Sequence, residues 1–555
     1  MSGPEAVSPR ARALDETTTP FDLIVIGGGC NGAGIAWDGA LRGLRVLLLE
    51  KEDFGWATSA WNSRLIHGGL KYLEKYDVRL VRESLREREW LLKAAPHLVR
   101  PRQFVLPFYE RNAHSTTVLR VGMLAYDALS LDKSTPRHRI HRRGQVLDII
   151  PGLNTEGLQG AATYYDGQAD YAERISLEAA VAARQAGAVV LNHARVDRLL
   201  IDAERVSGVE FTDTVTGRSL TAGASIVVNA AGPWVDEVLA GGLRGAAPLM
   251  GGTKGTHLIV DPFPGAPVDS AMYYEAITDA RPMMVIPWLG RYIIGATDER
   301  FLGDLDTASA DDGEIDYILR ETNLVLPEAG LTREHILWSY TGVRPLPHHP
   351  DGPTSDITRR HVLHEHSQVA SHRVHGLYSV IGGKLTTFRA LAQDVNDRVV
   401  RDLGAKHRTC TTRASRLPGG RTVQYDAFAE AFAKGARVSP VTAQRLLRLY
   451  GTRAVEVDAL IGHDPALGRE ISGADGAIEA EVVFAIQEDL AVTLTDLVAR
   501  RLMTGLGGDL GLGSLDGIAE VAARALEWDP DRVEEEKRRY RHYIAKFEQD
   551  REVSL

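Results

Sequence analysis

A glycine-rich run near the N-terminus carries the first residues whose spacing suits chemistry. It reads Gly-Gly-Gly-Cys-Asn-Gly and places glycines at the G-x-G-x-x-G positions Gly27, Gly29 and Gly32. The first permits a tight turn, the second lets a pyrophosphate approach the backbone, and the third lets the next helix pack on the sheet. Free N–H groups at the start of that helix attract phosphate. The run therefore predicts a dinucleotide-binding site.

Glu50 ends the apolar segment that follows this run, and an acidic side chain there can bind the ribose hydroxyls of a dinucleotide. The same carboxylate disfavours a 2′-phosphate, which argues against NADP. The glycine run does not by itself distinguish FAD from NAD. A second glycine pair, Gly382-Gly383, precedes an expected helix whose N-terminus would face a flavin that becomes negative on reduction. This pair and the interruptions of the nucleotide domain favour FAD.

The elements of an α/β fold are expected around these glycines. The segments Leu23–Ile26 and Leu44–Leu49 are continuous apolar runs, which are typical of parallel strands buried on both faces. Further along the chain, strands are expected at Ala188–Leu191, Ser225–Asn229 and Gly376–Ile381, and helices at Ile175–Gly187 and Leu385–Val400. The FAD-binding domain is therefore assembled from residues 21–72, 172–249 and 346–405.

The intervening segments, residues 73–171 and 250–345, are expected to form a substrate domain. They hold alternating patterns, as at Met283–Pro287 and Tyr292–Gly295, which are typical of an antiparallel sheet. Residues 1–20 are polar and are expected to be a flexible tail. After the turn at Leu417–Gly420, residues 421–555 are expected to form a helical domain, with Asp529 capping the last helix.

The composition limits the class of protein. The chain has 555 residues and a formal net charge of −10, which argues against general binding to nucleic acid, because such binding requires many phosphate-neutralising cations. Two cysteines, Cys30 and Cys410, do not indicate a disulfide framework and fit a reducing compartment. No run of about 18 apolar residues is present to span a membrane. Residues 1–20 lack the apolar core of a signal peptide.

A group of histidines raises the question of a metal site. Their H-x-x-H and H-x-H spacings would suit metal ligands, but no nearby cysteine completes a site. We therefore predict that the chain binds no metal. The histidines are His361, His364, His366, His372 and His375.

Several motifs together resemble one known family. The most specific are His67–Glu74, which reads His-Gly-Gly-Leu-Lys-Tyr-Leu-Glu, and Gly342–Leu346, which reads Gly-Val-Arg-Pro-Leu. In the family's order they accompany Phe21–Glu50, Ala57–Ser59, Ser63–Ile66, Lys254–His257, Val285–Trp288 and Gly382–Thr387. In these motifs the chain is similar to the FAD-dependent glycerol-3-phosphate dehydrogenases. The resemblance spans Phe21–Leu391 and is looser in the helical C-terminus.

The resemblance implies a Rossmann-like FAD-binding domain of the amino-acid-oxidase type, with FAD held without a covalent link. It places Thr58, Ser59, Ser63 and Arg64 along the cofactor, and it places His67 and the two glycines after it near the flavin ring. Together with the glycine and acidic positions above, the residues expected to bind the cofactor are Gly27, Gly29, Gly32, Glu50, Thr58, Ser59, Ser63, Arg64, His67, Gly68, Gly69, Val196, Ala231, Gly232, Gly383, Lys384, Leu385 and Thr386.

The resemblance also implies oxidation of sn-glycerol 3-phosphate to dihydroxyacetone phosphate, with hydride transfer to flavin N5. His257 and His67 are the candidate bases for the hydroxyl proton, because an imidazole pKa of about 6.5 suits proton transfer at neutral pH. We prefer His257, and an arginine such as Arg344 would stabilise the alkoxide. The residues expected to bind the substrate are Lys71, Tyr72, His257, Arg344, Arg359 and Lys384.

Two departures from the family's pattern matter. Lys71 stands where the family usually has arginine, and a lysine cannot grip an oxyanion with two parallel bonds. The family's C-terminal Arg-Arg-Thr-Arg is here Arg500-Arg501-Leu502-Met503. The first departure concerns the details of substrate binding. The second concerns any partner or assembly role of the C-terminal domain.

The electron acceptor separates the remaining interpretations. Family members deliver electrons to membrane quinone, and the basic run Arg137–Arg143 is a candidate contact with an anionic membrane. The chain is therefore expected in the cytoplasm, peripheral to the inner face of the membrane, with glycerol 3-phosphate and quinone as partners and a homodimer as its assembly. The alternatives are an oxidase that forms hydrogen peroxide, a related amine or amino-acid oxidase, and a flavin-bound sensor or scaffold without turnover.

Overall fold

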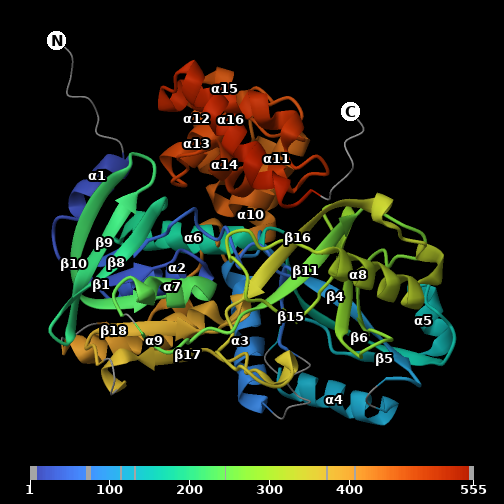
Figure 1. The fold of residues 1–555 in the computed structure, drawn as a ribbon. Helices are drawn as coiled ribbons and strands as arrows, with labels where there is room; N and C mark the ends of the chain where they lie inside the picture. The colour runs from blue at the N-terminus through green and yellow to red at the C-terminus, as the bar shows by residue number, and fades with distance from the viewer. Residues whose placement is uncertain are drawn as a thin grey trace.

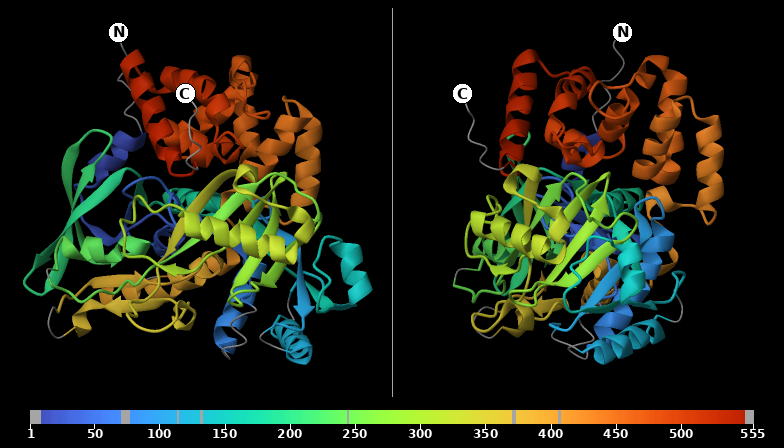
Figure 2. Two further views of the ribbon diagram at one scale, coloured as in Figure 1. Left: turned by 45° about the vertical axis from the view of Figure 1, so that its right-hand side comes forward. Right: turned by 90° about the vertical axis from the view of Figure 1, so that its right-hand side faces the viewer.

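The computed structural model describes residues 9–69, 77–112, 115–130, 133–243, 245–369, 373–404 and 408–548. The chain forms two sheet-based parts that lie side by side and a helical part that lies above both (Figure 1). Figure 2 shows the helical part on the same side of the sheets in two further views. This arrangement agrees with the fold class that the sequence predicts.

The first part contains an eight-stranded sheet whose centre is parallel. Its main strands follow the order β17 (Val362–Glu365), β18 (Leu377–Ile381), β10 (Arg218–Asn229), β1 (Phe21–Ile26), β2 (Val46–Leu49) and β7 (Val189–Leu191). All neighbours are parallel except β17 and β18. The carboxyl end of β1 therefore lies in the middle of one sheet edge, where ligands bind in open α/β folds.

The strands β1 and β2 are buried on both faces, which explains their continuous apolar sequence. Leu23 and Val25 belong to the core shared with α2 (Cys30–Leu41), α6 (Ala172–Gln185) and α9 (Phe388–Leu403). Ile24 and Ile26 belong to a separate core on the other face. That face is covered by α7 (Val235–Ala240) and by β8 (Ala194–Asp202) and β9 (Arg205–Asp213), which continue the sheet from β10.

The second part contains a ten-stranded sheet, and all of its strand pairs are antiparallel except β12 (Ala271–Glu275) with β4 (Val99–Tyr109). The alternating segments expected near residues 283 and 292 are β13 (Pro282–Trp288) and β14 (Arg291–Gly295). Helices α3 (Val78–Ala94), α4 (Thr116–Ala128), α5 (Arg143–Ile149) and α8 (Asp312–Val325) pack around this sheet. The strands are β15 (Glu299–Arg300), β11 (Thr253–Val260), β14 (Arg291–Gly295), β13 (Pro282–Trp288), β12 (Ala271–Glu275), β4 (Val99–Tyr109), β6 (Leu158–Ala169) and β3 (Leu65–Ile66), with β16 (Ile336–Arg344) beside β11 and β5 (Arg139–Arg142) beside β6.

The helical part begins after the expected turn at Leu417–Gly420. In its last helix, the Asp529 carboxylate accepts a hydrogen bond from the Arg532 backbone N–H (2.7 Å), and Pro530 takes the first position, as the sequence predicts. No helix in the described part of the chain is both long and apolar enough to cross a membrane. The helices are α10 (Tyr425–Gly435), α11 (Pro440–Tyr450), α12 (Ala454–His463), α13 (Glu479–Gln487), α14 (Leu494–Asp496), α15 (Leu515–Leu526) and α16 (Pro530–Ala545).

The expected flexible tail is wrong from residue 9 onward. Pro9–Glu16 forms helix α1, and the Arg10 guanidinium pairs with the buried Asp213 carboxylate (2.6 Å). Leu14, one turn later on the same face, is buried in the core beside β7. The polar composition of this segment did not indicate that Arg10 and Leu14, spaced four apart, attach it to the first sheet.

Candidate functional site

A cavity of about 1370 Å³ lies between the two sheets. Small-molecule sites usually enclose about 300–1000 Å³, so this cavity has room for a dinucleotide and a small substrate together. Its wall takes Gly29 from the turn after β1, His257 from β11 and Lys384 from the turn after β18. Segments more than 350 positions apart in the sequence thus meet in one site.

The turn between β1 and α2 has the form that a pyrophosphate requires. Gly27 adopts a φ of +103°, and a Cβ added there would lie 2.6 Å from the Ala230 carbonyl oxygen. A Cβ at Gly32 would lie 1.8 Å from the Gly27 carbonyl oxygen, so only glycine lets α2 approach the turn. Gly29 precedes α2 and lines the cavity, and the Cys30 backbone N–H donates to the Ser59 hydroxyl (3.0 Å). The N-terminus of α2 therefore faces the cavity, where a phosphate can bind.

Glu50 connects the end of β2 to this turn. One carboxylate oxygen accepts from the Gly28 backbone N–H (2.5 Å), and the other accepts from the Glu52 backbone N–H (2.9 Å) and the Trp56 indole (3.0 Å). Burial raises the pKa of Glu50, which these donors oppose. The side chain lines the cavity beside the glycine turn, the position from which an acid can reach the ribose hydroxyls.

The pairing of β11 with β16 brings the predicted substrate residues together. His257 lies opposite Tyr340, and Thr253 lies opposite Arg344, so His257 and Arg344 project from the same face of adjacent strands. A Cβ at Gly255 would lie 2.1 Å from an Arg344 guanidinium nitrogen. The glycine of the Lys-Gly-Thr-His motif therefore makes room for the arginine of the Gly-Val-Arg-Pro motif.

Arg344 and Arg359 share one carboxylate, that of Asp298. The two guanidiniums lie 3.0 and 3.1 Å from different oxygens of Asp298. Burial would raise the pKa of Asp298, but the two arginines outweigh it and hold the pKa below its usual value. The carboxylate aligns two cations along one wall of the cavity, and such a pair can bind a phosphate dianion. Asp298 lies in the short connection between β14 and β15, immediately before Glu299.

His257 is held as a neutral imidazole. Its ring stacks on Tyr340 (4.8 Å between centroids), and its Nε2 lies 2.9 Å from the Ser63 hydroxyl. Burial, and then the positive charges of Arg344 and Arg64, lower its pKa to about 3. A neutral ring has a free nitrogen lone pair, so His257 can accept a proton.

His67 and Lys384 face the cavity from neighbouring segments. The His67 backbone N–H donates to the Thr386 hydroxyl (3.2 Å), and the Lys384 ammonium donates to the Ser84 hydroxyl (2.5 Å). Burial, and then the Lys384 charge, lower the pKa of His67 to about 4. Burial lowers the pKa of Lys384 to about 8. At neutral pH the lysine is a cation and His67 is neutral.

Eighteen of the predicted site residues line the cavity. The other predicted residues that the structure describes are Gly32, Arg64 and Gly68, and they do not line the cavity. The residues in the wall are Gly27, Gly29, Glu50, Thr58, Ser59, Ser63, His67, Gly69, Val196, Ala231, Gly232, His257, Arg344, Arg359, Gly383, Lys384, Leu385 and Thr386. Lys71 and Tyr72 lie outside the described residues.

The Arg64 side chain does not line the cavity, although Arg64 is among the residues expected to bind the cofactor. The guanidinium is fully buried, pairs with the Glu173 carboxylate (2.6 Å) and lies 4.7 Å from the centre of the Trp288 ring. Its sequence position between Ser63 and Leu65 carried no sign of a partner more than 100 residues away. Gly68 also has a packing role, because an added Cβ would lie 2.3 Å from the Tyr126 hydroxyl.

Sequence reasoning missed two further parts of the wall. Asp166, on β6, accepts from the Arg88 guanidinium (2.5 Å), the Tyr126 hydroxyl (2.9 Å) and the Gly68 backbone N–H (3.2 Å). An apolar surface of the second sheet lies beside it and presents Phe104, Tyr164, Tyr273 and Met284 to the cavity. The alternating pattern predicted these strands but did not indicate which face meets the cavity.

Comparison with known proteins adds independent evidence. Residues 22–398 match the family described as FAD dependent oxidoreductase, and residues 410–533 match the C-terminal domain of alpha-glycerophosphate oxidase. The chain is 43% identical over 537 residues to a glycerol-3-phosphate dehydrogenase of Synechocystis sp., a match that covers 95% of this chain and 96% of the relative. It is 30% identical over 531 residues to an aerobic glycerol-3-phosphate dehydrogenase of Staphylococcus aureus, covering 93% and 92%.

Solved structures give the same result. The structure of a glycerol-3-phosphate dehydrogenase from Bacillus halodurans, complexed with FAD, superimposes with a TM-score of 0.78 at 25% sequence identity. The match covers 98% of each chain. The likeness therefore includes the helical part as well as the two sheets.

Proposed function

The chain belongs to the FAD-dependent glycerol-3-phosphate dehydrogenase family, and from this we propose that it oxidises sn-glycerol 3-phosphate to dihydroxyacetone phosphate and passes the electrons to a quinone. The choice of substrate is supported by one observation. Asp298 aligns Arg344 and Arg359 in the cavity wall that also holds the neutral His257. The glycine turn and Glu50 would hold FAD in the same cavity.

The phosphate of the substrate would bind the cations of the wall. Arg344 and Arg359 offer guanidinium donors that suit a phosphate dianion, and Lys384 adds a third positive charge. The amine and amino-acid oxidase alternatives are disfavoured, because these three cations suit a phosphate dianion better than a cationic amine or the single carboxylate of an amino acid. These cations also exclude a neutral alcohol from tight binding, since their own desolvation would then stay uncompensated.

Bound FAD would supply the acceptor for the hydride that leaves C2 of the substrate. His257 would take the C2 hydroxyl proton at Nε2, the nitrogen that contacts Ser63 at the cavity wall. The negative phosphate would offset the field of Arg344, which lowers the pKa of His257 in the free protein, and would make the ring more basic when substrate is bound. Arg344 would stabilise the developing alkoxide.

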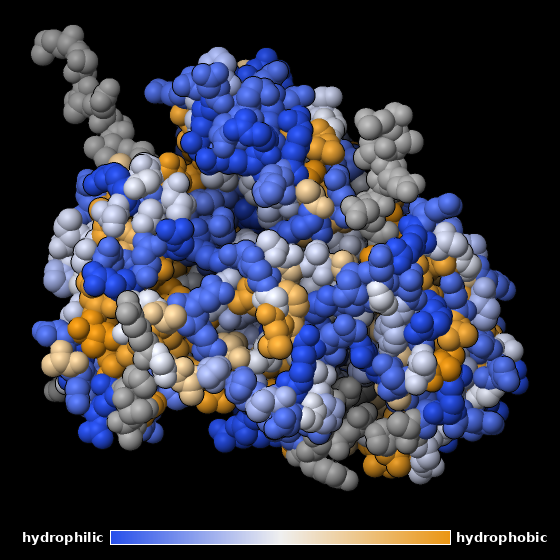
Figure 3. All heavy atoms as spheres, in the orientation of Figure 1, coloured by the Kyte–Doolittle hydropathy of each residue, from blue (hydrophilic) through white to orange (hydrophobic). Residues whose placement is uncertain are grey.

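A quinone could reach the site from the side of α4. On this helix Val118, Val121 and Leu124 are 54%, 59% and 61% exposed, and Figure 3 shows hydrophobic atoms at the lower edge where α4 lies. The buried face of α4 carries Tyr126, whose hydroxyl donates to Asp166 in the cavity wall (2.9 Å). Helix α4 thus lies between an exposed apolar surface and the cavity wall.

Basic side chains stand beside this apolar surface. Arg139, Arg142 and Arg143, in β5 and at the start of α5, are exposed. Such residues contribute about 1 kcal/mol each to attraction by an anionic membrane. Together the apolar helix face and the basic segment support peripheral attachment at the cytoplasmic membrane surface, where quinone is available.

The test is binding to vesicles of anionic phospholipid that contain quinone. We expect co-sedimentation at low salt and release at about 1 M salt, where the Debye length is about 3 Å. Replacing Arg139, Arg142 and Arg143 by Gln should weaken vesicle binding and quinone reduction, while turnover with a soluble dye stays unchanged. The matched control replaces three exposed arginines of the other sheet, Arg198, Arg205 and Arg218. Equal losses in both triple variants would contradict the proposed surface.

The oxidase alternative has one observation in its favour, the match of residues 410–533 to the C-terminal domain of alpha-glycerophosphate oxidase. An oxidase would return the electrons to oxygen and form hydrogen peroxide. Peroxide production that keeps pace with substrate consumption, in the absence of quinone reduction, would establish this alternative.

A further inference from the structure

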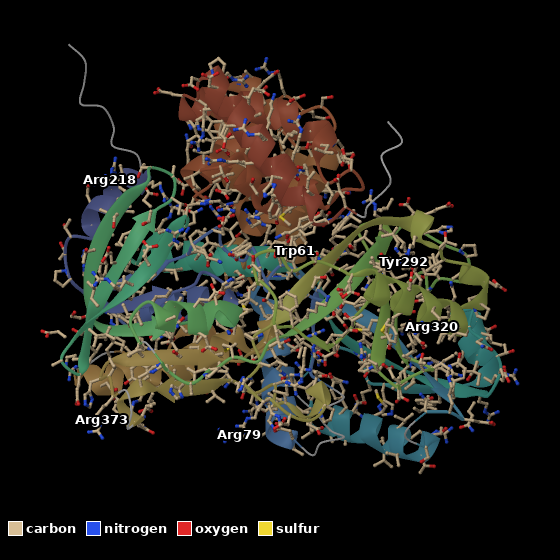
Figure 4. All side chains as sticks on the ribbon, in the orientation of Figure 1. Trp61, Arg79, Arg218, Tyr292, Arg320 and Arg373 are labelled. Carbon is tan, nitrogen blue, oxygen red and sulfur yellow. The ribbon has the colours of Figure 1, made fainter. Side chains whose placement is uncertain are left out.

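The helical part contacts one segment of the cavity wall at three places. This segment, residues 50–64, is called here the cofactor loop, and ten of its residues line the cavity: Glu50, Lys51, Gly55, Trp56, Ala57, Thr58, Ser59, Trp61, Asn62 and Ser63. Asp53 of the loop pairs with Arg500 and Arg501, the Lys546 ammonium lies 5.5 Å from the Trp56 ring, and Phe547 packs on Trp61 (4.6 Å). Figure 4 places Trp61 where the three parts meet.

The Asp53 carboxylate is the most constrained of these contacts. It is fully buried and accepts from Arg500 Nε (2.5 Å), from Arg501 Nη1 (2.6 Å) and Nη2 (2.9 Å), and from Asn192 Nδ2 (3.0 Å). Burial would raise its pKa, but Arg501 first and Arg500 with it outweigh that effect and lower the pKa. The carboxylate is therefore ionised, and its charge depends on two cations supplied from the other end of the chain.

The two arginines are held in place from their own side. Arg500 also contacts Asp496 (3.2 Å), and Arg501 Nε donates to the Asp489 backbone carbonyl (2.8 Å). Neither arginine lines the cavity. Asp53, His193 and Asp496 come close enough to share a metal ion, but the guanidiniums already neutralise these carboxylates. The cluster is therefore an ion-pair network between two parts of the molecule.

We propose that Arg500 and Arg501 are positioning residues for FAD, and that the helical domain acts as a clamp which holds the cofactor loop against the dinucleotide. Removal of one guanidinium leaves Asp53 as a partly unpaired buried charge, which is strongly unfavourable. The loop relieves this by moving Asp53 toward water. Glu50 and Ser59, which lie three and six residues away and contact the glycine turn, move with it.

The experiment compares two buried arginine variants of the full chain. Arg501→Gln leaves Asp53 short of a partner, and Arg42→Gln does the same to Asp38, a fully buried carboxylate that does not line the cavity. FAD is removed, and its Kd is measured by titrating the apoprotein and following flavin fluorescence. We expect Arg501→Gln to raise the Kd of FAD at least tenfold and Arg42→Gln to leave it within twofold, although both lower the Tm of the apoprotein. At saturating FAD, kcat and KM of Arg501→Gln should match the wild type within twofold.

Two outcomes would overturn the proposal. One is an equal loss of FAD affinity in both variants, which would show a general effect of instability. The other is an unchanged Kd in Arg501→Gln. The double variant Asp53→Asn with Arg501→Gln removes both charges and should recover part of the FAD affinity. If Arg501→Gln does not fold, Phe547→Ala tests the same clamp at Trp61, with at least a tenfold rise in Kd expected. FAD titration involves no substrate, so its failure is distinct from failure of the proposed oxidation.

Discussion

The Arg344 guanidinium is held in the cavity wall by several contacts with the protein. It donates to Asp298, to the Lys254 and Thr297 backbone carbonyls, and lies over Gly255. In the proposed reaction, this fixed position would let Arg344 bind the substrate phosphate or the C2 oxygen without reorganising. Neutral His257 projects from the same sheet face, so the two residues can act on one bound molecule.

The substitution Arg344→Ala should lower kcat/KM for glycerol 3-phosphate. The expected loss of transition-state stabilisation is about 2–5 kcal/mol, because the opposite charge paired with Arg344 would lose its partner. FAD content should stay unchanged, since Arg344 belongs to the second sheet and not to the glycine turn. Steady-state kinetics and the flavin absorbance of the purified variant check both expectations. Unchanged kcat/KM would remove Arg344 from the site.

We expect Lys384 to make the proposed reaction depend on pH. Burial lowers its pKa to about 8, so the free protein loses this cation as the pH rises through about 8. We expect kcat/KM for glycerol 3-phosphate to fall above about pH 8, because this ratio reports the protonation of the free enzyme. Lys384→Arg keeps its charge at all these pH values and should shift the decline to higher pH. A pH profile that is the same in both proteins would contradict this role.

At this scale most of the residues predicted for the site line the cavity, because the glycine run carries its own spacing and the histidine and arginine motifs resemble those of one family. The sequence did not predict Asp298 or Asp166, since one carboxylate among 74 acidic residues carries no mark of its partners. Arg64 was assigned to the cofactor because the family resemblance places it there beside Ser63, and of the two only Ser63 lines the cavity. The ion pair of Arg64 with Glu173 depends on tertiary contacts that no local pattern contains.

The paired strands β11 and β16 position the substrate residues. Their register sets Gly255 opposite Gly342, and a Cβ at Gly342 would lie 1.9 Å from the Trp61 backbone carbonyl oxygen. The cofactor loop can therefore approach β16 closely, and the Thr58 hydroxyl donates to the Val343 carbonyl (2.6 Å). The two glycines explain at element scale why these motifs combine glycine with chemically active residues.

The substitution Gly255→Ala tests this arrangement. Its Cβ would lie 2.1 Å from an Arg344 guanidinium nitrogen, and the arginine must move. Because a displacement of about 1 Å can cost about a hundredfold in rate, we expect kcat/KM to fall by about ten- to a hundredfold with little change in Tm. Gly435→Ala is the control, since an added Cβ there meets nothing within 4 Å. Wild-type kinetics in Gly255→Ala would contradict the proposed packing.

The strands and helices themselves were largely predictable, because buried parallel strands are continuously apolar and the last helix carries its own cap. The register of β11 against β16 was not, since it links residues about 80 positions apart. Helix α1 was missed for a related reason. Its stability depends on Arg10 and Leu14 contacting distant segments, while its composition is polar.

The whole molecule joins its helical part to the first sheet through buried charges. His193, beside the first sheet, contacts Asp496 (3.0 Å) in the same network as Asp53, Arg500 and Arg501. Burial opposes protonation of His193, but the Asp496 carboxylate outweighs it and raises the pKa of His193 above its usual value. The role of the C-terminal Arg-Arg pair was invisible in a sequence with 64 lysines and arginines. A homodimer stays a prediction.

This network makes stability depend on pH. Because the folded pKa of His193 is raised, its contribution to the free energy of unfolding is fully present below about pH 6.5 and is lost as the pH rises through the folded pKa. We expect the Tm of the wild type to decline across this window, and His193→Gln to show a smaller decline. Calorimetry between pH 6 and 9 measures both, and parallel curves would show that His193 does not contribute.

The central claim is that glycerol 3-phosphate reduces FAD bound in the cavity between the two sheets. The most direct measurement is the visible absorbance of the purified flavoprotein, mixed with sn-glycerol 3-phosphate under anaerobic conditions. We expect rapid loss of the oxidised flavin band, with one equivalent of dihydroxyacetone phosphate formed per flavin. We expect little reduction by glycerol, which lacks the phosphate that Arg344 and Arg359 would bind. An unchanged spectrum in a fully flavinated protein, or equally fast reduction by glycerol, would contradict the claim.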